Sequence, residues 1–462
     1  MTASTGYKKA ADYVVRQFKS FGLEPGWQDA DDSKTYFQSV PFTRFQFGEN
    51  NVLTVRRNGL TEEFFKGGNA FEFARPGKGP LDLPLHNPVF VGYGICEPGL
   101  GWDDFSSLDL EGKLAIILSG FPVNPNEGPQ FPQDVRRKYS DRRNGDSIRF
   151  QNVIQRGAVG IIALPDSNVS GNWNSIVSQL KRSNLVPVED YGSAVRGSSP
   201  VPSLLVHADL VSRLFKDLGF DPLTQDGDYR TFELDNLELG LTIDVAQEKV
   251  DCFNVIGTIN GTNPELSDEY ITLGAHLDHL GKDGNVVYRG ANDNASSCVL
   301  ILEVVEALAR KPLHRPLMVV LFTAEEIGHF GSLHFVAHPP VPHENIILNI
   351  NFEQIGAKSR TFDGVWAIGP SDQEESLSAA HKNVEEITLG FDDIESQIPV
   401  ISGSDTLSFY QKGLPAIILG SGGFPEHHTP DDNPDLIDYD HLYRAARFVL
   451  AYIEEVGNAE RQ

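Results

Sequence analysis

Histidine is concentrated in the second half of this 462-residue chain, where eleven of the thirteen histidines lie between His276 and His441. Four stretches there place metal-binding side chains at the carboxyl end of a predicted strand. They are GAHLD (274–278), GANDN (290–294), FTAEE (322–326) and NFEQ (351–354). In open α/β sheets, ligand sites form in the crevice outside these strand ends. Together with HHTPD (427–431), the stretches offer enough imidazole and carboxylate groups for a two-metal site.

The adjacent acids Glu325 and Glu326 carry the clearest chemical signal, because they follow an apolar strand and unpaired buried acids are costly. A metal gives both a partner: one carboxylate can ligate it while its neighbour takes a proton from metal-bound water. A ligating His276 needs an acceptor for its second ring nitrogen, and Asp278 is the candidate for that role. The zinc pattern HExxH is absent, so a single-helix zinc site is not the explanation.

Each of the other stretches also has an ordinary structural reading. By itself, GANDN favours a helix cap, because Asp and Asn are preferred there. The double histidine at 427–428 could equally be a surface loop. Four further histidines lie beside prolines or charged residues and are expected to be structural or solvated: His314, His338, His343 and His381.

The elements that must position these groups alternate between strands and helices after about Lys249. Apolar runs predict strands at 255–259, 270–274, 316–323, 346–352 and 414–419, and periodicity predicts helices at 294–309 and 440–455. This alternation indicates an α/β fold. The N-terminus adds an amphipathic helix with apolar residues from Ala11 to Phe21, ending at Gly22.

A different character marks residues 85–245, with short β-rich segments at 89–95, 113–118, 160–164 and 203–207 between polar loops. The Gly/Pro-rich stretch 67–88 predicts a linker before them. The stretch 122–146 predicts a long loop with a functional or mobile surface.

Composition excludes several classes of protein. The 64 acidic and 38 basic side chains give a net charge of −26, which disfavours nucleic acid and anionic membrane surfaces as partners. Three cysteines are too few for a disulfide framework or a cysteine-based zinc finger. No apolar run reaches the roughly 18–20 residues of a membrane span. The N-terminus lacks a signal-peptide pattern, which fits a cytoplasmic protein or an exported one whose signal lies outside this sequence.

Six motifs in order resemble peptidase family M28, a family of zinc metallopeptidases that includes bacterial leucyl-type aminopeptidases. The motifs are GAHLDHLG, GANDNASS, LFTAEEIGHFGS, NINFEQIG, SGSDTLSF and HHTPDD. The resemblance spans residues from Asn254 to the C-terminus, together with the N-terminal helix. It implies a mixed, mostly parallel sheet covered by helices. It also implies an extracellular or periplasmic location.

The resemblance implies a role for each matching residue around two Zn²⁺ ions per chain. Asp293 would bridge the ions, one of which would also bind Glu326 and His428. The other zinc would bind His276 and Glu353. Glu325 would be the general base and acid, and Asp278 would orient His276. Three positions depart from the family pattern: His427 stands where tyrosine is frequent, Glu353 where aspartate is commonest, and Thr406 where histidine is frequent.

A second resemblance concerns the stretches 89–95, 110–113 and 157–161, which look like the protease-associated (PA) domain often inserted in such enzymes. The predicted organisation is therefore an N-terminal part of the peptidase domain at 1–84, a PA-like insertion at 85–245 and the main peptidase part at 246–462. The insertion is read as a lid or docking surface, with an inert appended domain as the alternative.

The expected function is a zinc aminopeptidase that removes N-terminal amino acids from peptides with a free N-terminus. Three other functions stay open at this point. They are a carboxypeptidase or dipeptidase on the same fold, a one-zinc aminoacyltransferase of the glutaminyl cyclase type, and a receptor-like binding protein without metal. No nucleic-acid partner and no membrane span are expected, and the oligomeric state is not predicted.

Overall fold

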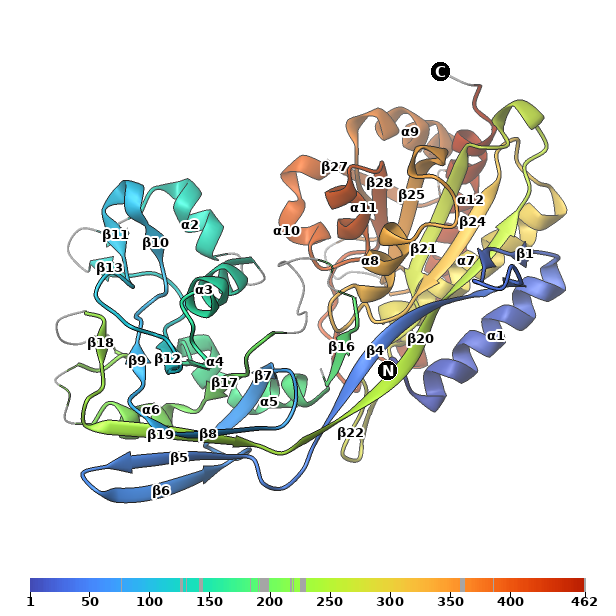
Figure 1. Cartoon of the computed structure of the whole chain (residues 1–462). Helices are drawn as coiled ribbons and strands as arrows, with labels where there is room; N and C mark the ends of the chain where they lie inside the picture. Colours follow the sequence, from blue (N-terminus) through green and yellow to red (C-terminus); the bar gives the residue numbers. More distant parts are fainter. Residues whose placement is uncertain are drawn as a thin grey trace. The chain divides into compact units, whose positions relative to one another are not determined.

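The chain forms two compact units in its computed structural model (Figure 1). Unit 1 comprises Met1–Pro41 and Asp251–Gln462, and unit 2 comprises Phe42–Val250. The structure describes residues 1–75, 77–124, 128–129, 131–140, 144–182, 184–189, 191, 199–216, 218, 220–224, 230–357, 362–384 and 386–460.

Unit 1 is built on a mixed sheet in which most neighbouring strands are parallel. Seven of its strands follow the order β20-β24-β21-β25-β28-β26-β27, and β1 (Glu24–Pro25) pairs antiparallel with β20. β21 is parallel to both β24 and β25, β25 to β28, and β26 to β27, whereas β20 and β28 pair antiparallel with β24 and β26. The bounds are β20 (Val245–Ile259), β21 (Tyr270–His276), β24 (Leu317–Phe322), β25 (Ile346–Glu353), β26 (Gly364–Gly369), β27 (Thr388–Asp393) and β28 (Ala416–Gly420). The fold class expected from the sequence is confirmed.

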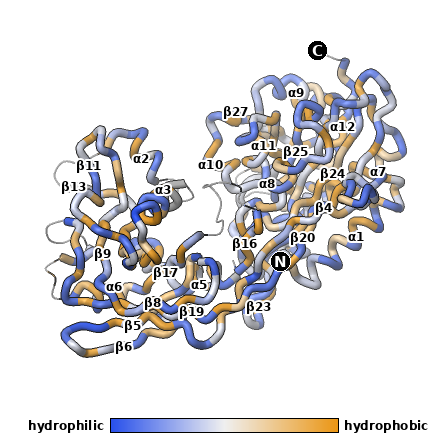
Figure 2. The backbone as a smooth tube through the Cα atoms, viewed as in Figure 1, coloured by the Kyte–Doolittle hydropathy of each residue, from blue (hydrophilic) through white to orange (hydrophobic). Residues whose placement is uncertain are grey.

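Every residue of β24 is apolar (Figure 2) and buried, as expected for a strand covered on both faces. Successive side chains of a strand point to opposite faces of the sheet. Leu317, Val319 and Leu321 accordingly join one hydrophobic cluster, and Met318, Val320 and Phe322 join another. Two layers of helices therefore enclose the sheet, and burying each large apolar side chain contributes about 1.5–3 kcal/mol.

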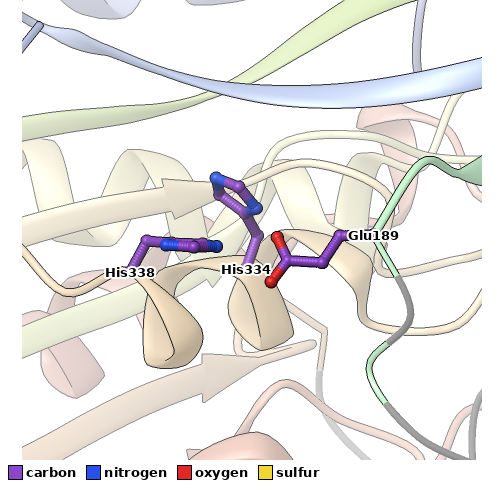
Figure 3. Close-up of side chains that lie close together, drawn as sticks. All are labelled: Glu189, His334 and His338. Atoms are coloured by element: carbon purple, nitrogen blue, oxygen red, sulfur yellow. The ribbon is translucent and has the colours of Figure 1, made fainter. Parts of the chain in front are cut away.

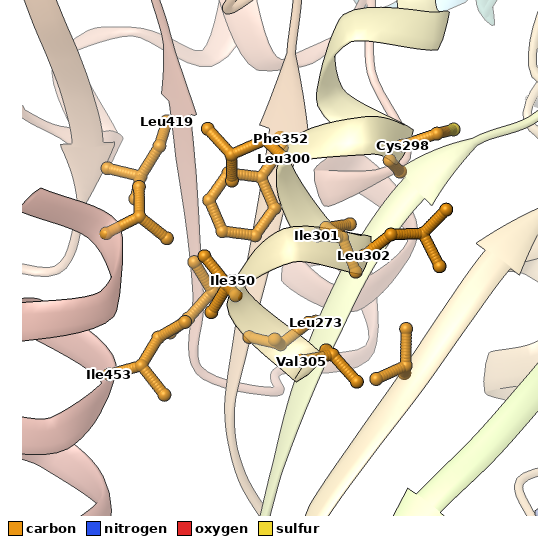
Figure 4. Packing of buried hydrophobic residues seen from close by; sticks show 14 of the residues in the cluster. Leu273, Cys298, Leu300, Ile301, Leu302, Val305, Ile350, Phe352, Leu419 and Ile453 are labelled. Carbon is orange, nitrogen blue, oxygen red and sulfur yellow. The ribbon is translucent and has the colours of Figure 1, made fainter. Parts of the chain in front are cut away.

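The first layer contains α1 (Thr5–Phe21), α7 (Ser297–Arg310), α9 (Glu374–Asn383) and α12 (Tyr439–Asn458). Figure 4 shows part of this cluster, with side chains from α7 and α12 packed on Leu273 of β21 and Ile350 of β25. The opposite layer contains α8 (Phe330–Ala337) and α11 (Thr406–Lys412), through Phe335 and Phe409.

The N-terminal helix begins and ends as expected. Ser4 caps α1 by accepting a hydrogen bond from the Tyr7 N–H. Gly22 ends the helix with φ 87°, a left-handed conformation that glycine adopts without a steric cost. Among the described residues, no helix is long and apolar enough to cross a membrane.

Unit 2 is rich in β-structure and has two principal sheets. A six-stranded sheet has the order β18-β9-β12-β15-β17-β7, and a four-stranded sheet has the order β6-β5-β19-β8. The bounds are β5 (Val52–Arg57), β6 (Leu60–Phe65), β7 (Phe71–Arg75), β8 (Leu81–His86), β9 (Val89–Phe90), β12 (Leu114–Ile117), β15 (Gly160–Ala163), β17 (Ser203–Val206), β18 (Phe232–Glu233) and β19 (Leu237–Ile243). Its helices are α2 (Gln133–Ser140), α3 (Asn144–Ile154), α4 (Ser167–Gly171), α5 (Trp173–Arg182) and α6 (Ala208–Leu214). Its likeness to a PA domain stays a prediction.

The remaining elements are short strands and one short helix, together with the two long strands in which the chain passes from one unit to the other. β4 (Phe37–Phe47) and β20 contain the residues at which the chain passes from one unit to the other. The short elements are β1 (Glu24–Pro25), β2 (Trp27–Gln28), β3 (Lys34–Thr35), β10 (Cys96–Glu97), β11 (Trp102–Asp103), β13 (Val123–Asn124), β14 (Gly128–Pro129), β16 (Leu185–Pro187), β22 (Gly281–Asp283), β23 (Val286–Tyr288) and α10 (Ile398–Ile401).

Three expectations from the sequence are corrected by the structure. Residues 42–84, assigned there to the peptidase domain, lie in unit 2, because β5 pairs along its whole length with β19. The predicted linker at 67–88 contains β7 and β8, whose alternating apolar residues are obscured by the surrounding glycines and prolines.

The third correction concerns the predicted long loop at 122–146, which contains α2 and the start of α3. Half of the residues of α2 are charged, and among its described side chains Val135 and Tyr139, four residues apart, contribute to the hydrophobic core. Helical periodicity is therefore too sparse to recognise in the sequence. Parts of this stretch, at 125–127, 130 and 141–143, lie outside the described residues.

Candidate metal centre

The candidate ligands are positioned by four strands that are parallel neighbours in unit 1. His276 is the last residue of β21 and Glu353 is the last residue of β25. Glu325 and Glu326 follow the end of β24, and His428 lies in the loop after β28. Because the carboxyl ends of parallel strands meet at one edge of a sheet, these side chains converge there. The predicted convergence is therefore present in the structure.

Asp293 lies at the middle of the cluster, and its carboxylate oxygens face in different directions. Oδ1 is 3.1 Å from His276 Nε2, whereas Oδ2 is 3.3 Å from His428 Nε2 and 3.0 Å from His427 Nε2. Its main-chain N–H donates to Asp432 Oδ2 at 3.1 Å. Although burial would raise the pKa of the Asp293 carboxyl, hydrogen bonds from the three histidines hold it well below its usual range.

Two sets of donor atoms result, one beside each oxygen of Asp293. In the first set, His276 Nε2 is 3.4 Å from Glu353 Oε2. In the second, His428 Nε2 is 3.0 Å from Glu326 Oε2. Within the described residues, three combinations of His, Asp and Glu in this cluster have their ligand atoms within 4.8 Å of one another. They are Asp293/His427/His428, His276/Glu325/Glu353 and His276/Asp293/Glu326.

The structure changes how Asp278 reaches its neighbours. The acceptor facing His276 Nδ1, at 2.9 Å, is the main-chain carbonyl of Asp278 rather than its carboxylate. The carboxylate instead accepts the main-chain N–H of Glu325 at 3.2 Å and the hydroxyl of Thr2 at 2.8 Å. Asp278 therefore fixes two groups of the site: the ring orientation of His276 and the main chain at Glu325.

The two adjacent glutamates have pKa values shifted in opposite directions. Burial, reinforced by nearby carboxylates, raises the pKa of Glu325 well above its usual value. Glu326 is equally buried, but hydrogen bonds from His279 and His428 lower its pKa to about 2. Such divergent environments separate a group that exchanges protons from one that stays ionised.

Residues outside the predicted set also belong to the site. His279 Nδ1 lies 2.6 Å from Glu326 Oε1, and His329 Nε2 lies 2.9 Å from Glu325 Oε1. Asn294 donates to Glu353 Oε2 at 2.9 Å. Neither histidine carried a sequence signal for the site. The residues from Glu325 to His329 form a turn rather than a helix, and His279 lies in the loop that follows β21.

The irregular backbone before α7 explains an error in the predicted helix boundary. The sequence predicts a helix from 294, whereas Asp293 and Asn294 have non-helical φ and ψ and regular helix begins at Ser297. This departure belongs to the segment that carries the Asp293 carboxylate into the site.

The histidines expected to be structural lie away from this cluster. His343 and His381 each contact a main-chain carbonyl, of Val336 and Ile387 respectively. His338 is exposed and follows α8, with its ring centroid 4.6 Å from that of His334 (Figure 3). His314 is also exposed.

Residues 254–453, which contain every ligand candidate, match the model of peptidase family M28. This segment is a family M28 domain. The chain is similar to aminopeptidase YwaD of Bacillus subtilis, with 28% identity over 229 residues, or 45% of this chain and 46% of that protein. It is also similar to a probable leucine aminopeptidase of Trichophyton verrucosum, with 24% identity over 234 residues, or 46% of this chain and 60% of that protein. The matches thus span about half the length of these curated relatives.

Solved structures of two aminopeptidases share the fold over the whole chain. An aminopeptidase from Aneurinibacillus sp. strain AM-1 has a TM-score of 0.60 and 18% identity, covering 100% of this chain and 91% of that one. A zinc aminopeptidase from Bacillus subtilis has a TM-score of 0.53 and 17% identity, covering 100% and 92%. At these identities the similarity establishes the fold alone.

Proposed function

We propose that this protein is an aminopeptidase that holds two zinc ions per chain and removes N-terminal amino acids from peptides. The proposal depends on the orientation of the Asp293 carboxylate. Its Oδ1 lies 3.1 Å from His276 Nε2, and its Oδ2 lies 3.3 Å from His428 Nε2. A carboxylate placed in this way can bridge two cations. The aminopeptidase names of the curated relatives support the choice of reaction.

The donor set fits zinc. Each set offers one imidazole, one glutamate and one oxygen of Asp293, and three protein ligands with an open position are typical of catalytic zinc. The ligands are His276 and Glu353 beside one oxygen, and Glu326 and His428 beside the other. Several carboxylates converge in a buried pocket, where their mutual repulsion is costly without cations. Paired dications would supply that compensation.

When bound, zinc would lower the pKa of a coordinated water and polarise the scissile carbonyl. Glu325 then acts as the general base: it takes a proton from the attacking water and passes it to the leaving amine. The position of Glu325 suits this exchange, because its Oε2 faces the donor set, 3.8 Å from His276 Nε2. Asp278 holds the main chain of Glu325 during this transfer, through the hydrogen bond to its N–H.

A panel of substrates with and without a blocked amino terminus tests the proposal. Aminoacyl amides and short peptides with a free terminus should be cleaved, and N-acetylated copies should not. A chelator should abolish the cleavage, and added zinc should restore it. Equal cleavage of acetylated peptides would overturn the aminopeptidase assignment in favour of another peptidase on this fold. Cyclisation of N-terminal glutamine would indicate the aminoacyltransferase. A zinc-loaded protein that turns over no substrate would indicate the receptor-like binding protein.

A further inference from the structure

His329 lies beside Glu325 in an unusual backbone conformation. It is the N-cap of α8, with φ 59° and ψ 27°, and its side chain is only 4% exposed. A left-handed φ is uncommon for residues other than glycine, and asparagine, aspartate and histidine adopt it most often among the rest. The main-chain N–H of His329 donates to the Glu325 carbonyl at 3.0 Å. This turn brings the imidazole to the Glu325 carboxylate.

The contact engages one particular oxygen of that carboxylate. His329 Nε2 lies 2.9 Å from Glu325 Oε1, whereas Glu325 Oε2 is directed to the donor set, 3.8 Å from His276 Nε2. At the other end of the residue, Asp278 holds the Glu325 N–H. Glu325 is therefore fixed at its main chain and at one carboxylate oxygen, and its second oxygen faces the metal pocket.

A second buried acid lies within electrostatic range of this pair. Asp405, just before α11, is fully buried. Burial and the Glu325 charge raise the pKa of Asp405, and the His329 charge opposes them. His329 is thus placed in a region with two buried acids, where a donor has more effect than at the surface.

We propose that His329 is a positioning residue, which holds Glu325 Oε1 so that Oε2 faces the attacking water. The proposal rests on the function given above, in which Glu325 is the base. A glutamate side chain has three rotatable bonds, and without this contact it samples orientations that do not reach the water. Loss of a supporting contact of this kind typically lowers activity about 10- to 100-fold. Substrate affinity should change little, because His329 acts through Glu325.

Two amide replacements separate the side-chain role from the backbone role. The Nε2 atom of glutamine reaches the place of histidine Nε2, whereas the amide of asparagine reaches only the place of Nδ1. His329→Gln should therefore keep at least about a third of the wild-type kcat, and His329→Asn should lose about 10- to 100-fold. If the left-handed backbone were the reason for this residue, asparagine would be the better replacement. His329→Phe keeps a ring without a donor and should behave like His329→Asn.

The measurements are kcat, KM, bound zinc and melting temperature for the wild type and the three variants. KM should stay within about threefold and the zinc content should not change. Crystal structures of the wild type, His329→Phe and His329→Gln give a readout independent of activity: the Glu325 carboxylate should move or take several orientations only in His329→Phe. The comparison of crystal structures does not require activity. If the wild type cleaves no peptide, the proposed function is refuted, but the positioning of Glu325 by His329 can still be tested. An unmoved Glu325 in His329→Phe, or activity of His329→Asn at or above that of His329→Gln, would overturn the proposal.

Discussion

Replacing the proposed base by its uncharged isostere, Glu325→Gln, gives a direct test of the chemistry. Glutamine preserves the shape of the side chain and can still accept a hydrogen bond from His329, but it cannot take a proton. The donor sets beside Asp293 are left intact, because Glu325 Oε2 is 3.8 Å from His276 Nε2, farther than Glu353 Oε2 at 3.4 Å. The variant should therefore fold and bind zinc as the wild type does.

The expected loss follows from the burial of the base. General-base catalysis contributes roughly 10²- to 10⁴-fold in rate. The Glu325 side chain is only 10% exposed, so bulk water cannot readily substitute for it. We therefore expect the upper part of that range, a loss of about 10³- to 10⁴-fold in kcat, which corresponds to about 4–5 kcal/mol in activation free energy.

The assay compares kcat for a free aminoacyl amide with zinc content per chain, measured on the same preparation. Glu303→Gln is the matched control, because Glu303 is an exposed glutamate on α7 and its replacement should leave both quantities unchanged. A kcat for Glu325→Gln within about tenfold of the wild type, with zinc retained, would refute the assignment of the base.

Two other substitutions have outcomes that the structure fixes in direction. His428→Ala should reduce bound zinc from two ions per chain toward one, because His428 contacts both Glu326 and Asp293. His427→Ala is the control and should keep two ions. Mass spectrometry under native conditions measures the zinc content of both variants, and equal losses would contradict the assignment of His428 as the ligand. Burial raises the pKa of Asp405 to about 8, so the folded state holds this carboxyl protonated where the unfolded chain does not, and stability falls as the pH rises from about 4 to 8. Asp405→Asn removes that loss. The free energy of unfolding of this variant, measured with denaturant and relative to the wild type, should therefore increase by about 4 kcal/mol between about pH 5 and pH 9. A difference between the two proteins that does not depend on pH would refute the reasoning.

The sequence predicted the sheet and its site because both rest on local patterns. The apolar run of β24 and the acids after it stand together in the chain, so strand and ligands could be recognised in one stretch. The convergence of His276 and Glu353 then followed from parallel strand ends meeting at one edge. The α2 and β8 elements were missed because charge or proline obscured their few apolar residues.

What the sequence could not provide is the detail that depends on tertiary contact. The spacing of His276 and Asp278 predicted that one orients the other, but only the fold shows that the carbonyl contacts the ring while the carboxylate binds the Glu325 N–H. The burial of Asp405 likewise depends on how the helix layer covers the sheet. The same holds for the contact of His329 with Glu325, which depends on the left-handed conformation of His329 at the start of α8.

Anomalous diffraction at the zinc edge, from crystals of the zinc-loaded protein, tests the paired metal centre most directly. Two peaks about 3.5–4 Å apart, one on each side of the Asp293 carboxylate, are the expected result. A single peak, or two peaks that do not share Asp293, would contradict the account.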